Sequence, residues 1–394
     1  MPRQLSSRTL AIVAAVCAGV TLTDVYIAQP LVTLMAADLG VSVGAAQGVI
    51  TSSLVGYAAG LLFLVPLADR YQPRHLVRIF SSIGTAALLL GTMAPNLILT
   101  IVATLVAAMF GIIPQILIPL VMSKSAVSSR ARAMSIVQTG MICGMMLSRP
   151  ALGVLGQYSG WRAAYLAAAI ATIIVGWTTS FLLPDTERTS SVSYAGLFRS
   201  MGRFVRISPQ LRNACLRSAA MYAAFNALWA TLTPVLTAAP FNLSVGQASL
   251  VGILGLGSAF VAPFAGILTD RHGSRLTIGL GLGALVAALA CFWAGHSVLW
   301  LMLAGVLLLP AGLQYGQVSS QHAALSVDHA AGGRLNTVFM FSSFIGGAIG
   351  SQVAGLILPP LGWTGVCAAA AIFLAAAILL SIIGTRKAAP ALVV

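Results

Sequence analysis

The chain has 394 residues, of which 59% are hydrophobic and 7% are charged, and its mean hydropathy is +0.97. Soluble domains carry about 25% charged residues, because a protein folded in water has to cover itself with polar groups. The composition therefore excludes soluble enzymes, nucleic-acid-binding proteins and disordered proteins, and the net charge of +14 has to be explained by where the basic residues fall along a membrane topology.

Long apolar segments predict the structural elements in chain order. A membrane-spanning helix needs about 20 mainly apolar residues, and the first apolar run is too long for a signal peptide, so we expect it to remain as a span. We predict an all-α membrane protein with twelve transmembrane helices in two pseudo-symmetric six-helix bundles. The predicted spans are 9–36, 46–68, 79–94, 98–123, 134–157, 163–183, 213–238, 247–269, 276–294, 298–320, 335–357 and 364–384.

The basic residues predict the orientation. With twelve spans and a cytoplasmic N-terminus, nearly all of the 21 Lys and Arg residues fall in cytoplasmic segments, as the positive-inside rule requires. Arg162 is the exception on the other side, and Arg149 falls within a span. Both termini are therefore expected in the cytoplasm.

The domain prediction follows from the longest cytoplasmic segment. We expect one half over 1–184, a linker over 185–212, and a second half over 213–394. The linker carries Arg199, Arg203 and Arg206 at helical spacing. It is either a connection whose charge only follows the positive-inside rule or a short helix on the inner membrane surface.

Two kinds of site are not expected. The five cysteines lie far apart in or near apolar runs, so we predict small buried side chains and neither disulfides nor a metal site. No metalloprotease, serine-hydrolase or phosphate-loop motif occurs in a useful context, so we predict no catalytic residue and no cofactor.

An internal repeat relates the two halves at an offset near 202. Matching pairs occur in the same order in both halves: Ser42-Val43-Gly44 and Ser244-Val245-Gly246, Arg132 and Arg334, Gly144 and Gly346, Gly153 and Gly355, and Gly160-Trp161 and Gly362-Trp363. Because six predicted spans separate each pair, the repeats are parallel. Parallel six-helix halves occur in secondary transporters, where the substrate site lies near the membrane midplane.

The loop after the eighth predicted span carries the most specific motif. Its sequence, GILTDRHGSR over 266–275, resembles the loop signature of the major facilitator superfamily, and VPLADRYQPR over 65–74 is a weaker copy without the two glycines. An acid followed by bases in a tight turn can pair with nearby charges or with a helix N-terminus. The resemblance implies that these loops latch the two halves and bias alternating access. The predicted latch consists of Asp69, Arg70, Arg74, Asp270, Arg271, Gly273 and Arg275.

Further motifs narrow the resemblance to the bacterial drug and sugar efflux branch, whose members resemble drug–proton antiporters. They are Tyr26 with Gln29-Pro30-Leu31, Gly56-Tyr57 with Gly60-Leu61, and GRLNTV over 333–338. The fourth span lacks the arginine of the better-known antiporters, and Arg149 stands where their fifth span has a proline. The resemblance also implies a monomer in the bacterial inner membrane.

Two charges lie deep within predicted spans, Asp24 and Arg149. Each costs roughly 2.5–3.5 kcal/mol at a helix centre, so each is expected to face a cavity or a partner. Asp24 lies about 24 Å beyond Arg8, and Arg149 about 26 Å beyond Arg132, along their helices. At equal depth the two can pair, either as a functional pair or as a structural one. Asp24 is the predicted proton carrier.

A set of polar and aromatic side chains is predicted to line a substrate cavity, although each can instead bond between helices. The predicted lining residues are Asp24, Tyr26, Gln29, Tyr57, Gln115, Gln138, Arg149, Tyr222, Asn226, Trp229, Gln314 and Gln317. Pro30 either kinks the first span or is a proline that a membrane helix tolerates.

The leading functional prediction is a secondary transporter that exports a small organic compound in exchange for protons, with the proton gradient as its energy source. The alternatives are an uptake permease that binds an anionic solute through Arg149, and a facilitative uniporter. A channel and a membrane-embedded enzyme are less compatible with the motifs.

Overall fold

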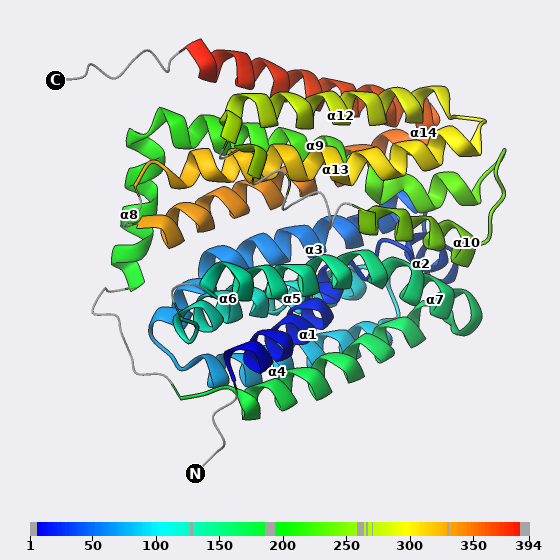
Figure 1. Ribbon diagram of the computed structural model, residues 1–394. Coiled ribbons are helices and arrows are strands. Elements are labelled where there is room, and N and C mark those ends of the chain that lie inside the picture. The colour runs from blue at the N-terminus through cyan, green and yellow to red at the C-terminus, as the bar shows by residue number, and fades with distance from the viewer. Residues whose placement is uncertain are drawn as a thin grey trace. The chain divides into compact units, whose positions relative to one another are not determined.

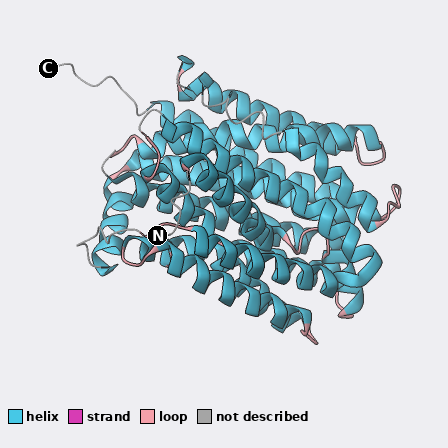
Figure 2. Cartoon of the chain, turned by 60° about the horizontal axis from the view of Figure 1, so that its bottom comes forward, coloured by secondary structure: helices cyan, strands magenta, loops and turns pink. Residues whose placement is uncertain are grey.

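The computed structural model describes residues 6–126, 129–185, 194–257, 264, 267–269, 271–328 and 331–386. All regular structure in these ranges is helical (Figure 2). Contacts divide the chain into two compact units: unit 1 holds 1–194 and 230–259, and unit 2 holds 195–229 and 260–394. The boundary at 194 falls inside the predicted linker. The two units are defined by contacts in space, whereas the predicted halves are defined by the sequence repeat. The predicted division at 184 and 213 therefore stays a prediction.

Unit 1 contains the first six predicted spans (Figure 1). Several of them are interrupted, because prolines and glycines break the hydrogen-bond ladder of a helix. Their helices are α1 (Ser7–Tyr26), α2 (Val32–Asp38), α3 (Val43–Phe63), the 3-10 helix η1 (Val65–Asp69), α4 (Pro73–Thr92), α5 (Leu97–Phe110), α6 (Ile113–Ser123) and α7 (Arg130–Leu182).

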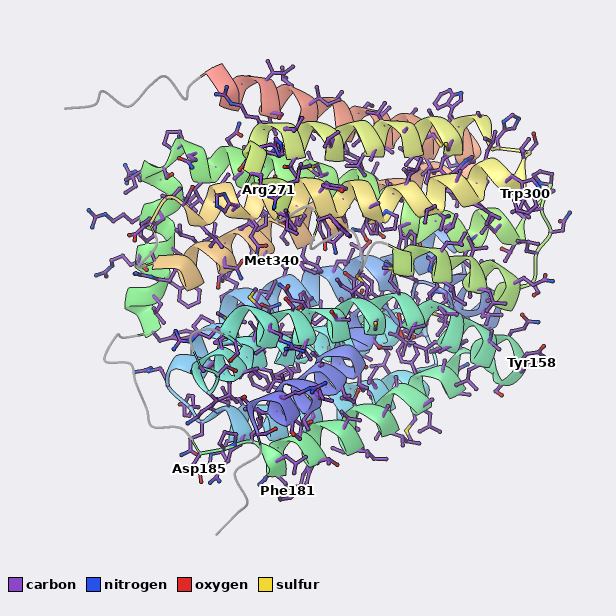
Figure 3. All side chains as sticks on the ribbon, in the orientation of Figure 1. Tyr158, Phe181, Asp185, Arg271, Trp300 and Met340 are labelled. Carbon is purple, nitrogen blue, oxygen red and sulfur yellow. The ribbon has the colours of Figure 1, made fainter. Side chains whose placement is uncertain are left out.

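The breaks within unit 1 have local causes. Of the two alternatives for Pro30, the structure shows the break, since α1 ends at Tyr26 and α2 begins at Val32. Gly111 and Pro114 separate α5 from α6. In α7, Gly160 has φ of 80°, which turns the chain back and makes α7 two antiparallel spans. Tyr158 and Asp185 accordingly lie at opposite ends of unit 1 (Figure 3).

Glycines allow a close helix contact in unit 1. A Cβ on Gly140 would overlap the backbone of Ala15, and one on Gly144 would overlap the backbone of Gly19. Small residues of this kind let membrane helices approach to backbone distance. The first and fifth spans are therefore neighbours, as the Asp24–Arg149 hypothesis required.

Unit 2 is built from the linker helix and the later spans. Its helices are α8 (Tyr194–Ile207), most of α9 (Pro209–Thr237), α12 (Ser274–Ala294), α13 (Leu299–Leu325) and α14 (Gly332–Arg386). In α14, Gly362 has φ of 62° and reverses the chain as Gly160 does in α7. The same close contact recurs, because a Cβ on Gly346 would overlap Ala219 and one on Gly350 would overlap Ala223.

This packing refines the repeat. Gly144 and Gly346 are equivalent by sequence, and they meet Gly19 and Ala219 respectively. The first helices of the two halves are therefore related by an offset of about 200, two fewer than in the rest of the chain. The position equivalent to Asp24 is Ala224, and not Asn226 as the uniform offset predicted. Ala224 and Asn226 are both uncharged, so the position equivalent to Asp24 is neutral with either offset.

The linker forms a helix with two faces. In α8, Leu197 and Met201 are buried, whereas Arg199, Arg203 and Arg206 are exposed. Its end is fixed by Arg212, whose Nη1 donates to the carbonyl oxygens of Val205 and Arg206. Leu197 and Met201 thus pack on protein, whereas Val205 and Ile207 of the same helix are exposed, so a position of α8 on the inner membrane surface stays a prediction.

The eighth predicted span is the most irregular. It begins as α10 (Val245–Leu250), continues as the 3-10 helix η3 (Val251–Leu256), and is helical again at 267–269. The N-terminal serine of this span, Ser244, accepts a hydrogen bond from the Gln247 N–H, as Ser42 does from the Ala45 N–H in α3. The repeated Ser-Val-Gly therefore marks an N-cap in each half.

The described helices confirm a multi-pass membrane protein. Nine of them are long and apolar enough to cross a membrane, among the residues that the structure describes. Two of these nine, Arg132–Leu182 and Gly332–Ile383, are long enough for two spans each and reverse at a glycine. With the broken span that starts at Val245, the arrangement is consistent with twelve.

Candidate transport site

Asp24 is enclosed within unit 1. Its side chain is 1% exposed and accepts hydrogen bonds from the Thr172 hydroxyl, at 3.2 Å to Oδ1 and 3.0 Å to Oδ2. Thr172 belongs to the second half of α7, which is the sixth span. The carboxyl group is thus held by a neutral partner from a neighbouring span.

Arg149 lies on the fifth span, in the first half of α7, and is 2% exposed. Its aliphatic stem passes across Gly252 of η3, since a Cβ there would lie 2.8 Å from Arg149 Cδ. Gly153, one turn further along α7, contacts Ser249 of α10 in the same way. The irregular eighth span therefore covers Arg149, and it can approach this closely because residue 252 has no side chain.

The hypothesis that Asp24 and Arg149 form an ion pair is not supported by the described residues. The ion pairs among the described residues are Arg74–Asp185 and Arg162–Asp38. The reason is helical geometry. The Thr23 hydroxyl contacts the Gly144 carbonyl oxygen at 3.4 Å, so Thr23 faces the fifth span. Asp24, one residue later, is rotated by about 100° toward the sixth.

A third buried charge was missed by the sequence analysis. Arg217 counts there as a cytoplasmic loop charge, but the structure places it inside α9 with 5% exposure. Its Nε donates to Ser320 Oγ and its Nη1 to Asn213 Oδ1, both at 3.1 Å. The predicted span at 213–238 already contained Arg217, so the signal was present and was overruled by the positive-inside count.

The predicted cavity residues of unit 1 do not gather in one place. Tyr57 is buried and accepts a 3.4 Å hydrogen bond from Gln115 Nε2. Tyr26 and Gln29 are also buried, at 4% and 2% exposure, whereas Gln138 is exposed. Burial of Tyr26 and Gln29 at the break after α1 is compatible with helix contacts as well as with a substrate site.

Gln47 is a polar residue that the sequence analysis did not single out. It lies in α3 with 0% exposure, and neither of its side-chain amide atoms has a hydrogen-bond partner among the described residues. A buried amide of this kind costs about 1–3 kcal/mol. Gln47 is therefore a further candidate for a polar binding position, and a glutamine beside glycine in an apolar span gave no distinguishing signal.

The predicted cavity residues of unit 2 are closer together. Trp229 stacks on Phe225 with ring centroids 5.4 Å apart, and Tyr222 lies 5.4 Å from Phe344. Asn226 is fully buried and packs against Gly347. One face of α9 thus carries an aromatic row with an amide within it. Gln317 takes part in a different network, with Ser218 and Ser343, and Gln314 is partly exposed.

A groove of about 430 Å³ runs along unit 1 between α1 and the fifth span. Its walls are almost entirely apolar, with Thr23 and Ser148 at one end. None of the twelve predicted cavity residues lines it. The groove is lined by Ile12, Ala15, Val16, Gly19, Val20, Thr23, Ile136, Gly140, Cys143, Gly144, Leu147, Ser148, Ala151 and Leu152.

The two latch loops differ in conformation. Gly273 has φ of 81° and precedes α12, whereas its counterpart Gln72 has φ of −65° and precedes α4. Only the backbone at residue 273 requires glycine. The weaker motif can therefore have a glutamine at residue 72. Arg70 and Arg271 are exposed. Asp270 and the side chain of Asp69 lie outside the described residues, and the predicted latch role of the loop residues, Arg275 included, stays a prediction.

Arg74, one of the predicted latch residues, has an ion-pair partner within unit 1. It pairs with Asp185, at the end of the sixth span, at 2.6 Å between Nη1 and Oδ1. Both residues belong to unit 1. This pair ties the loop after η1 to the end of α7.

Asp38, Trp161 and Arg162 form a hydrogen-bonded cluster at the other end of unit 1, which we call the clasp. Asp38 at the end of α2 accepts hydrogen bonds from Arg162 Nη1 and from Trp161 Nε1, and Arg162 Nη2 also donates to the Ala94 carbonyl oxygen at 2.9 Å. The bonds from Arg162 and Trp161 hold the pKa of Asp38 below its ordinary value. The clasp fixes the turn at Gly160 against α2 and the loop before α5.

The sequence family is decided by a match over nearly the whole chain. The family model described as Major Facilitator Superfamily matches residues 14–226 and again 214–392, one match for each half of the repeat. This chain belongs to the Major Facilitator Superfamily. It is therefore a secondary transporter that works by alternating access, and the family resemblance in the loop motif and the predicted fold class are confirmed.

Relatives of this major facilitator are transporters. It is 35% identical over 375 residues to "Probable transporter SCO4007" of Streptomyces coelicolor, covering 95% of this chain and 87% of the relative. It is 26% identical over 314 residues to "Multidrug resistance protein D" of Escherichia coli, covering 77% and 76% of the two chains. Some relatives are thus named for drug resistance.

Solved structures agree with the fold. The nucleoside transporter NupG superposes with a TM-score of 0.73 at 14% identity, covering 96% of this major facilitator and 98% of that chain. The xylose transporter XylE from Escherichia coli gives 0.73 at 12% identity, with 97% and 99% covered. At these identities the likeness shows the fold alone.

Proposed function

We propose that this major facilitator exports a small organic compound in exchange for protons, with Asp24 as the proton carrier. The observation that carries the proposal is the enclosure of Asp24: it is the carboxylate that the sequence places inside a span, it is 1% exposed, and its hydrogen-bond partner is a threonine hydroxyl. An intramembrane carboxylate costs several kcal/mol, so it is retained for a function.

The chemistry follows from the environment. Burial disfavours the charged form of a carboxyl group and hydration favours it. A carboxyl group that is enclosed in one state and hydrated in the other therefore takes up and releases a proton in each cycle. Thr172 can serve both forms, since a hydroxyl donates to a carboxylate and accepts from a carboxylic acid.

The relatives support the direction of transport. "Multidrug resistance protein D" of Escherichia coli and "Chloramphenicol resistance protein" of Streptomyces lividans, 26% and 25% identical, are named for resistance, which export provides. We further propose a monomer in the bacterial inner membrane with both termini in the cytoplasm. The distribution of basic residues supports this orientation.

The test uses purified protein in liposomes that contain a pH-sensitive dye. Drugs, dyes, sugars and organic acids are added one at a time, and proton movement is recorded for wild type, for Asp24→Asn and for the matched variant Asp185→Asn. Proton flux opposite to substrate flux, present in wild type and in Asp185→Asn but absent in Asp24→Asn, is expected. Substrate flux without proton flux, equal in all three proteins, would indicate a uniporter and leave Asp24 structural.

A second function is favoured by the two buried arginines. Arg149 and Arg217 are 2% and 5% exposed, and a buried guanidinium is suited to an anionic solute. On this alternative the protein is an uptake permease. Arg149→Ala would then abolish transport of the anion, while Asp24→Asn would leave it intact.

A further inference from the structure

The buried guanidinium of Arg217 lies where three helices of unit 2 meet. Its hydrogen bonds join α9 to Ser320 of α13 and, through Asn213, to α14, since Asn213 Nδ2 donates to the Leu380 carbonyl oxygen at 2.8 Å. Arg217 is eight residues from the start of α9, or about 12 Å along the helix. The cation is therefore inside the bundle and not at its surface.

The hydrogen-bond partners of Arg217 are neutral groups. Within the described part of the chain, the arginines in ion pairs are Arg74 and Arg162, whose side chains are 35% and 38% exposed. Arg217 is far more buried than either, yet its hydrogen bonds go to a hydroxyl and an amide oxygen. A desolvated cation without a counter-charge is unfavourable, and the ion pairs of the described residues do not include Arg217, so an anion bound there would be stabilising.

The geometry leaves donors for that anion. A guanidinium has five N–H groups in a planar fork, and the bonds to Ser320 and Asn213 use one from Nε and one from Nη1. The side chain keeps 5% of its surface exposed. A fork of parallel N–H groups matches the two oxygens of a carboxylate.

Neighbouring hydroxyl and amide groups extend the polar surface by one helical turn. Ser218, next to Arg217, donates to Gln317 Oε1 at 2.7 Å and lies 2.5 Å from the Ser343 hydroxyl. Gln317 and Ser320 are three residues apart and share a face of α13. This network keeps the interior beside Arg217 polar.

We propose that Arg217, with Ser320 and Asn213, is a binding site for a compact monoanionic group, the carboxylate of a small organic solute. The inference deepens the proposed transport function by naming a substrate class, and it does not depend on proton coupling through Asp24. The same chemistry suits a chloride ion from solution, so the experiment separates the two sources.

The experiment measures the thermal unfolding midpoint of the purified full-length protein in detergent. Sodium acetate and sodium chloride are each titrated against sodium methanesulfonate, a bulkier anion, at equal ionic strength. Acetate is expected to raise the wild-type midpoint by about 2–4 °C with saturation, as ligand binding to the native state requires. A shift with chloride and none with acetate would overturn the carboxylate assignment.

Two variants test whether the acetate shift arises at Arg217. Arg217→Gln is expected to lose the acetate shift. Arg78→Gln is the matched control, since Arg78 Nε also donates to a serine hydroxyl, Ser180 Oγ at 3.3 Å, without being buried, and it should keep the shift. An equal shift in wild type and Arg217→Gln would overturn the site.

Ser320→Asp decides the question should Arg217→Gln fail to fold. It places a carboxylate where the Nε of Arg217 already donates. The variant is expected to have a higher midpoint in the reference salt and no further response to acetate. An acetate response as large as that of wild type would show that the anion binds elsewhere.

Discussion

The two halves of the repeat bury charge at different positions on the same scaffold. In unit 1 the charges are Asp24 and Arg149, and the equivalent positions of unit 2 hold Ala224 and Ser351. In unit 2 the buried charge is Arg217, whose equivalent in unit 1 is Cys17, a buried thiol. The helix contacts themselves are shared, as the glycine pairs show. The scaffold thus does not require any of these charges, so each is evidence of a function.

The shared contacts give the largest expected effect. Gly144→Leu and Gly346→Leu should each destabilise the protein by about 3 kcal/mol or more, because the added side chain would overlap the backbone of Gly19 or Ala219 and membrane helices cannot separate cheaply. The measurement is the unfolding midpoint of each variant in detergent. Gly279→Leu is the control, since a Cβ there meets nothing within 4 Å. Loss in only one half would break the claim that the scaffolds are equivalent.

The contact of Gly252 with Arg149 lies within unit 1, and a coupled pair of variants tests it. Gly252→Val should reduce transport and stability by roughly 1–3 kcal/mol, because the new side chain would displace the Arg149 stem. Combining it with Arg149→Ala should recover most of the stability loss, since the obstacle is removed. A double-mutant cycle measures this coupling. Additive effects would mean that η3 does not rest on Arg149.

The two halves also differ in the hydrogen bonding of a buried polar side chain at equivalent positions. Gln47 has no hydrogen-bond partner among the described residues, whereas its repeat equivalent Ser249 donates to the Val245 carbonyl oxygen at 2.6 Å. Gln47→Leu should raise stability by about 1–3 kcal/mol, since the buried amide is removed. Ser249→Ala should not stabilise. Urea unfolding followed by tryptophan fluorescence gives both values, and a destabilised Gln47→Leu would reveal a partner outside the described residues.

The two latch loops should respond differently to one substitution. Gly273→Ala should cost about 1–2 kcal/mol, because φ of 81° places a Cβ against the following carbonyl oxygen. Gln72→Ala should change stability little, since φ of −65° suits any residue. Thermal midpoints of the two variants test this contrast. Equal losses would indicate that contacts of the Gln72 side chain, and not backbone conformation, decide the outcome in the first loop.

The clasp at Asp38 gives the smallest effect. Half-exposed pairs contribute about 0.2–1 kcal/mol, so Asp38→Asn should cost no more than that at pH 7. Because Arg162 and Trp161 lower the pKa of Asp38 from its ordinary 3.8, the contribution is present above pH 3.8 and is lost as the pH falls through the lowered value. Unfolding midpoints of wild type and Asp38→Asn should therefore converge below pH 3.8. A difference that persists there would assign the effect to packing.

Much of the architecture followed from the chain alone. The twelve apolar segments and the repeated Ser-Val-Gly, which the structure shows to be an N-cap in each half, depend on local hydrophobicity and backbone chemistry, which a sequence displays directly. The sequence also indicated that Asp24 and Arg149 lie at similar depth, because rise per residue fixes depth along a helix.

Tertiary structure decided which way those side chains face. Depth does not fix rotation, so the chain alone could not show that Asp24 turns to Thr172 while Arg149 lies under Gly252. It could not show that Arg217 is buried either, because a charge near the start of a span is solvated or enclosed depending on the neighbouring helices. The sequence determined helices, caps and depth, which depend on neighbours along the chain. Partners and enclosure required the fold, because they depend on residues brought together from distant helices.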